Sequence, residues 1–254
     1  MEDVERGGSK KFWRKAAIAL GLMAWVFVSF MAVQLLFAGA LFVMKLSGVS
    51  FESVNEAVFS ASAGIIIYSL TILVAIGVPW LLRRKTTLKE LGLDRFVGWK
   101  DYGWLGAGAV TYIILTVVIS TIAMALMPFI DFEQKQTTGY ESVAHSYEYV
   151  LAFIGLVVIA PVAEEVLFRG YLFGKLRKAK IKTWVSVLLV SLLFAIVHFQ
   201  GNVGVDVFAL SIVLCLLRIF SGSLWPSIML HMLKNGVAFY FLFVNPSILS
   251  TLGG

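Results

Sequence analysis

Residues 149–172 read YVLAFIGLVVIAPVAEEVLFRGYL, and this stretch carries both the structural and the chemical signal of the chain. A helix needs about 20 predominantly apolar residues to cross the hydrocarbon core of a bilayer, and this run is long enough. Its charged residues are Glu164, Glu165 and Arg169. Charged residues inside a membrane span are costly and usually functional. The stretch therefore predicts a spanning helix that contributes to an active or binding site.

The composition predicts a membrane protein over the whole length of the chain. Of the 254 residues, 59% are hydrophobic and 14% are charged, whereas a soluble domain carries about 25% charged residues. We expect an all-α, polytopic transmembrane helix bundle of about seven spans that forms a single membrane domain, 1–254. The expected spans, of which the fifth and sixth are short, are 16–44, 57–82, 102–127, 149–172, 183–199, 205–220 and 226–246.

The distribution of basic residues predicts the orientation. Of the 21 Lys and Arg residues, 16 lie in the amino-terminal arm, in 83–100 and in 175–182. These segments alternate with acidic loops, so the positive-inside rule places the N-terminus in the cytoplasm. We expect 175–182 to contact anionic lipid headgroups. A nucleic-acid partner is not expected, because no basic segment is interleaved with aromatic residues.

Helical spacing assigns different roles to the two glutamates. Glu165 and Arg169 are four residues apart and share a face, where an ion pair can form. Glu164 is rotated by about 100° from Glu165 and points elsewhere. We therefore interpret Glu165–Arg169 as structural support and Glu164 as the carboxylate that takes a proton from water.

Later spans offer further polar groups to the same cavity. His231 and Asn235 share a helical face in the seventh span, and His198 ends the fifth. A rise of 1.5 Å per residue places His198 roughly 8 Å farther from the cytoplasm than Glu164. A tilted fifth span or a bend at Pro161 would remove this mismatch; otherwise His198 lies outside the site.

Two other cations have a simpler interpretation. Lys234 and Arg218 lie near the ends of their expected spans. Long basic side chains at such positions reach toward the headgroups, so we assign neither of them to the site.

Three motifs in order resemble one known family. Glu164-Glu165-Val-Leu-Phe-Arg169 fits EExxxR, Phe194-Ala-Ile-Val-His198 fits FxxxH, and His231-Met-Leu-Lys-Asn235 fits HxxxN. Together, within 149–240, they resemble the CPBP or Abi family, which includes CAAX prenyl proteases of the Ras-converting type and bacteriocin-processing enzymes.

The resemblance implies an intramembrane endopeptidase whose site is reached from the cytoplasmic side. It implies that Glu164 and His198 activate water, and that His231 and Asn235 stabilise the oxyanion. We favour a mechanism without a cofactor. The alternative is a zinc site formed by Glu164, His198 and His231, a sufficient ligand set for catalytic zinc, although the common HExxH helix is absent.

The substrate class stays open between a prenylated CAAX protein and a bacterial peptide or membrane-protein precursor. The substrate would reach the site from the membrane or the cytoplasmic side. The membrane would be the plasma membrane in a prokaryote or the endoplasmic reticulum in a eukaryote. A non-catalytic membrane scaffold or bacteriocin-immunity protein is the alternative function. A proton-coupled transporter is a third, because buried carboxylates and histidines also form proton relays.

Overall fold

The computed structural model describes residues 2–51 and 53–247, and these residues form helices and connections without a β-strand. The helices are α1 (Glu2–Leu46), α2 (Glu56–Ile72), α3 (Val78–Leu81), α4 (Leu88–Leu91), α5 (Trp99–Leu126), α6 (Ser146–Phe153), α7 (Ala160–Glu165), α8 (Phe173–Lys178), α9 (Thr183–Ile196), α10 (Gly201–Ser221) and α11 (Trp225–Phe239). Wider, π-helical turns at Leu73–Gly77, Ile154–Ile159, Val166–Leu172 and Tyr240–Val244 continue these helices.

The predicted all-α membrane bundle is confirmed. Within the described residues, six continuous helical segments are long and apolar enough to cross a membrane. The seventh apolar helix, α9, has 14 residues and is only about 21 Å long, less than the roughly 30 Å of a bilayer core. The sixth predicted span is not short, however: α10 has 21 residues, because it begins at Gly201 rather than at 205.

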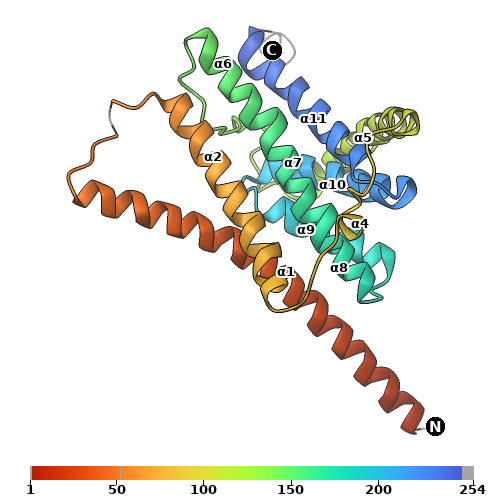
Figure 1. The fold of residues 1–254 in the computed structure, drawn as a ribbon. Coiled ribbons are helices and arrows are strands. Elements are labelled where there is room, and N and C mark those ends of the chain that lie inside the picture. Colours follow the sequence, from red (N-terminus) through yellow and green to blue (C-terminus); the bar gives the residue numbers. More distant parts are fainter. Residues whose placement is uncertain (1, 52, 248–254) are drawn as a thin grey trace.

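The helix from α6 through α8 lies at the centre of the bundle (Figure 1). It packs against α2 on one side and against α9, α10 and α11 on the other, while α5 covers α10 and α11. α1 crosses obliquely beside α2, and its amino-terminal part extends away from the bundle (Figure 1). Most of α1 and α5 is exposed, as expected for helices whose apolar side chains face lipid.

The basic ends of the helices are fastened together by the segment between α3 and α5. Glu90 forms ion pairs with Lys175, at 3.2 Å, and with Lys178. The Lys178 ammonium, followed by that of Lys175, holds the pKa of the Glu90 carboxyl below its usual range. Arg218, in the last turn of α10, donates a hydrogen bond to the Glu90 carbonyl at 3.2 Å, so its side chain is bound within the protein.

The connection 127–145 folds back against the bundle at the opposite end. Gln200 donates to the Lys135 carbonyl at 2.7 Å, and Asn202 donates to the Gln134 carbonyl at 2.6 Å. Ser60 of α2 donates to the Gly139 carbonyl at 2.7 Å. This connection is therefore tied to α2 and to the α9–α10 turn.

Reporter fusions test the orientation. Fusions within 45–55 and 130–145 should report the outside, and fusions within 85–100 and 178–182 should report the cytoplasm, because the basic residues gather in the latter segments. Alkaline phosphatase and green fluorescent protein activities give the two readouts. A cytoplasmic signal from 130–145 would reverse the helix that carries Glu164 and contradict the orientation.

Candidate active site

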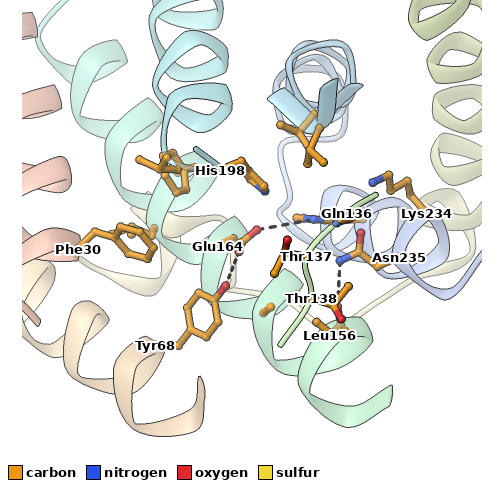
Figure 2. Close-up of a pocket in the computed structure, with 17 residues that line it drawn as sticks. Phe30, Tyr68, Gln136, Thr137, Thr138, Leu156, Glu164, His198, Lys234 and Asn235 are labelled. Carbon is orange, nitrogen blue, oxygen red and sulfur yellow. Dashed lines mark hydrogen bonds and ion pairs between the residues drawn. The ribbon is translucent and has the colours of Figure 1, made fainter. Parts of the chain in front are cut away.

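A cavity of about 280 Å³ lies inside the bundle and collects the predicted residues. Glu164, His198, His231 and Asn235 all line it, although they come from α7, from the turn after α9 and from α11. His198 shares the wall with Glu164 despite the mismatch in depth expected from counting residues. Figure 2 shows Tyr68 and Glu164 on one side of the cavity and Asn235 on the other.

The Glu164 carboxylate has different partners at its two oxygens. Tyr68 of α2 donates its hydroxyl to Oε1 at 2.6 Å. Oε2 lies 3.8 Å from Nε2 of His231, a separation too long for a direct hydrogen bond. One oxygen is therefore held in place while the other faces an open position.

Glu165 connects Arg169 to His231. The predicted Glu165–Arg169 ion pair is present, with Nη1 at 2.8 Å from Oε1 and both side chains fully buried. The same Oε1 accepts from His231 Nδ1 at 3.0 Å. Sequence spacing predicts only the first of these contacts. The second gives Glu165 a position directly behind an imidazole that lines the cavity.

Phe194 packs against the polar groups that surround it. The Arg169 guanidinium lies 4.2 Å from the centre of its ring, a distance at which a cation is attracted to the aromatic face. The rings of His198 and His231 meet Phe194 edge-to-face, at centroid distances of 4.8 and 5.8 Å. The phenylalanine of the FxxxH motif thus fixes both imidazoles.

His198 lies just beyond the end of α9, where the chain turns into α10. Its Nδ1 is 2.7 Å from the Phe194 carbonyl. A carbonyl only accepts, so Nδ1 carries the hydrogen, and Nε2 of the neutral ring keeps its lone pair. The open nitrogen of His198 is therefore an acceptor.

Asn235 satisfies a carbonyl that Pro161 leaves free. In the wide turn before α7, the Ala160 N–H bonds to the Gly155 carbonyl five residues back. The next bond in this register would join Pro161 to Leu156, but proline has no N–H. Asn235 donates Nδ2 to the Leu156 carbonyl instead, at 2.9 Å (Figure 2). An amide has two N–H groups, so a second donor remains.

The interpretation of Lys234 as a headgroup-seeking side chain is wrong. Its Nζ lies 3.0 Å from Asp206 of α10, and the residue lines the cavity. Asp206 also accepts from Tyr112 at 2.6 Å and from Thr116 at 3.0 Å. Asp206, which is half-buried, supplies the partner. An ammonium group inside the bundle is more stable when it is paired with a carboxylate than when it is unpaired.

Segments outside the motifs complete the wall of the cavity. Phe30 of α1 lines it, as do Gln136, Thr137 and Thr138 from the connection 127–145 (Figure 2). The backbone N–H groups of Thr138 and Gly139 bond to Glu141 and lower the pKa of its carboxyl, which holds this segment in a tight turn. The cavity is thus covered at the end opposite the basic loops.

One cavity residue, Tyr68, and the partner of another, Asp206, had only weak signals in the sequence. Asp206 is an acidic residue at the start of an apolar run. An acidic residue inside a membrane span usually pairs with a basic one, so its position was a weak indication of a partner for Lys234. Tyr68 is a single tyrosine within an apolar helix, and tyrosines are ordinary in membrane spans. Only the folded packing of α2 against α7 reveals its contact with Glu164.

The donor set suits a water site better than a metal site. His198 and His231 each have Nδ1 engaged, as metal-bound histidines do. Within the described ranges, however, no three His, Cys, Asp or Glu side chains are grouped so that they could hold one metal ion. Tyr68 also occupies one of the two Glu164 oxygens.

Comparison with known proteins gives a family match over the segment that carries the motifs. Residues 146–237 match the sequence model of the type II CAAX prenyl endopeptidase Rce1-like family. The matched segment runs from the start of α6 through the HxxxN motif of α11. No solved structure matches the chain.

Curated proteins from three bacteria are also similar. An uncharacterised 24.3 kDa protein of Escherichia coli is 27% identical over 201 residues, which cover 76% of this chain and 85% of that protein. The membrane-embedded CAAX protease MroQ of Staphylococcus aureus is 31% identical over 36% of this chain and 39% of its own length. The UPF0177 protein YxdF of Lactococcus lactis is 32% identical over 45% of this chain and 58% of its own length.

These matches agree with the three motifs and with the multi-pass helical architecture. Over residues 146–237, the chain is similar to the Rce1-like CAAX prenyl endopeptidases, as the three motifs predict.

Proposed function

We propose that the chain is an intramembrane endopeptidase that hydrolyses a peptide bond with a water activated by Glu164 and His198. One observation carries this proposal. A carboxylate inside a helix bundle has one oxygen fixed by Tyr68 and the other exposed to a cavity, 3.8 Å from an imidazole nitrogen. The second oxygen of Glu165 also lacks a partner among the described residues, but it is buried, whereas Glu164 lines the cavity.

The first step is proton removal from the water. Oε2 of Glu164 and the lone pair on Nε2 of His198 both face the cavity and can each accept from one water. Glu164 takes the proton as the water oxygen attacks the carbonyl carbon of the substrate. A positioned base of this kind contributes about 10²- to 10⁴-fold to the rate.

The second step requires donors at the developing oxyanion. Glu165 accepts from Nδ1 of His231 and so fixes the orientation of this ring. Its other nitrogen, Nε2, lies 3.8 Å from Oε2 of Glu164 and is the atom that donates to the oxyanion when it carries a proton. The second N–H of Asn235 lies on the same helical face. Each such donor lowers the barrier by about 3 kcal/mol when water is excluded.

Collapse of the tetrahedral intermediate completes the reaction. The bond between the carbonyl carbon and the leaving nitrogen breaks, and the nitrogen takes the proton that Glu164 accepted. The products are one new carboxyl terminus and one new amino terminus, and Glu164 returns to its ionised form. No group of the protein is consumed.

The substrate in this proposal is a peptide or protein segment that enters from the membrane or the cytoplasmic side. The segment 136–138 covers the opposite end of the cavity, which supports this direction. A prenylated CAAX protein and a bacterial precursor both fit, because each brings a peptide bond close to the cytoplasmic surface. The relative MroQ is a CAAX protease, which supports the same class of substrate.

Reconstitution separates this function from its alternatives. The purified full chain in phospholipid vesicles should generate new peptide termini from an added membrane-protein extract, as measured by mass spectrometry against protein-free vesicles. Proton uptake into the same vesicles without new termini would favour a transporter. A protein that binds a partner protein but shows no proton uptake and generates no new termini would favour a scaffold.

Tyr68→Phe tests the positioning of Glu164. The change keeps the ring but removes the hydroxyl that donates to Oε1, and a hydrogen bond to a charged group is worth about 10- to 100-fold in rate. We expect kcat to fall by that factor with little change in KM. Tyr240→Phe, on the exposed face of the last helix, is the matched control. An equal effect of both changes, or an effect on KM alone, would remove Tyr68 from the mechanism.

Metal removal tests the choice between a water site and a zinc site. We expect hydrolysis to survive dialysis against a zinc chelator, and the purified protein to contain much less than one zinc per chain. Loss of activity that added zinc restores, together with stoichiometric zinc by elemental analysis, would show that Glu164, His198 and His231 act as metal ligands.

A further inference from the structure

A second hollow, outside the catalytic cavity, lies between the amino-terminal part of α1 and the α8–α9 connection. Its volume is about 1000 Å³. α1 packs against both α8 and α9 here, near the point where α1 leaves the bundle (Figure 1). Lys15 of α1 bridges the two walls by donating to the Lys180 carbonyl at 2.9 Å. We call this hollow the basic groove.

Cations surround one end of the basic groove. Three come from α1, one from the end of α8 and two from the α8–α9 connection, namely Lys11, Arg14, Lys15, Lys178, Lys180 and Lys182. The lining residues include no Asp or Glu. In the described part of the chain, only Lys178 of these six forms an ion pair, with Glu90. The charge at this end is therefore largely uncompensated.

Apolar side chains line the remainder of the basic groove. They are mainly Phe12, Ile18, Leu20, Trp184, Val185 and Leu189. Phe12, Leu20 and Trp184 are each more than 60% exposed. Tryptophan and lysine occur together where a helix meets the membrane–water interface. The orientation by basic residues places this end of the groove at the cytoplasmic surface.

We propose that the basic groove is a binding site for an anionic phospholipid of the cytoplasmic leaflet. The negatively charged headgroup would contact Lys11, Arg14 and Lys182, and an acyl chain would lie along the apolar wall. A peptide fits less well, because its backbone N–H and C=O groups would need partners in an environment that is apolar beyond the cationic end. A free anion would leave the apolar wall uncovered.

Such a lipid would connect two parts of the catalytic bundle. α1 contributes Phe30 to the cavity wall, and α8 continues the helix that carries Glu164. The amino-terminal part of α1 otherwise has few buried residues. A lipid bound in the groove therefore holds α1 against α8 and α9.

Thermal unfolding and native mass spectrometry of the full-length protein in detergent test this site. The probe is phosphatidylglycerol, compared with phosphatidylcholine of the same acyl chains and with inorganic phosphate. We expect phosphatidylglycerol alone to raise the unfolding temperature and to remain bound in the mass spectrum. Equal effects of phosphatidylcholine or of inorganic phosphate would overturn the proposal.

Charge variants locate the headgroup. The combined change Lys11→Gln, Arg14→Gln and Lys182→Gln should weaken phosphatidylglycerol binding on the order of a hundredfold. Each Lys or Arg near an anionic lipid surface strengthens binding by roughly fivefold, and the variant loses three of them. The matched control, Arg83→Gln with Lys89→Gln and Lys100→Gln, removes the same charge from a cytoplasmic segment outside the groove. Equal binding by the two triple variants would contradict the site.

A filling variant locates the acyl chain without changing the charge. Ala16 lines the groove, whereas its neighbour Ala17 is exposed and does not. Ala16→Phe should reduce phosphatidylglycerol retention about tenfold by occupying apolar space, and Ala17→Phe should leave it unchanged. Retention that is unaffected by Ala16→Phe would show that lipid binds elsewhere on the surface.

Discussion

Glu164→Gln is expected to lower the rate of peptide-bond hydrolysis by about 10²- to 10⁴-fold. The amide keeps the shape of the side chain and can still accept from the Tyr68 hydroxyl, but it cannot take a proton from water. The rate at which new termini appear in reconstituted vesicles measures the effect.

The fold should survive this substitution. The Glu164 side chain is 15% exposed toward the cavity and forms no buried ion pair with Arg or Lys, so the unfolding temperature should stay close to that of the wild type. Glu133→Gln is the matched control and should leave the rate unchanged, because Glu133 is exposed in the connection 127–145 and does not line the cavity. Full activity of a folded Glu164→Gln protein would remove Glu164 as the base.

Glu165→Gln is expected to act chiefly on stability. It leaves the fully buried Arg169 guanidinium without a countercharge, and loss of one partner of a buried ion pair costs about 3 to 5 kcal/mol. The unfolding temperature in detergent should therefore fall clearly, and expression should drop. The stability of Glu164→Gln under the same conditions is the comparison.

The double change Glu165→Gln with Arg169→Met separates charge from packing. It removes both charges of the pair, so the free energy of unfolding should recover part of what the single change loses. Hydrolysis should not recover, because Glu165 also holds Nδ1 of His231. A stable and inactive Glu165→Gln protein beside a poorly folded Glu164→Gln protein would exchange the roles of the two glutamates.

The helical architecture followed from the sequence because its causes are local. The length of the apolar runs fixes which segments form long membrane helices, and the four-residue spacing predicts the Glu165–Arg169 pair that the structure contains. The boundaries of the short fifth helix were less certain. α9 ends at Ile196, and the chain turns there because Gln200 and Asn202 bond to a distant connection.

The contacts between helices did not follow from periodicity. Tyr68 meets Glu164 across 96 positions of sequence, and Asp206 meets Lys234 only once α10 and α11 have packed. The folding of 136–138 over the cavity also depends on long-range hydrogen bonds. A rise of 1.5 Å per residue gives depth only for helices parallel to one axis, so counting residues left the place of His198 open, and the lining of the cavity puts it beside Glu164.

The most direct test of an intramembrane, Glu164-dependent peptidase is a map of the bonds that it cleaves. New amino termini would be compared by mass spectrometry in membranes that carry the wild-type chain and in membranes that carry Glu164→Gln. We predict a set of new termini that is found only with the wild type. Each of them should lie on the cytoplasmic side, either inside a membrane-embedded or lipid-anchored segment or a few residues away from one. Identical termini in the two samples, or Glu164-dependent termini that lie only in large soluble domains, would contradict the account.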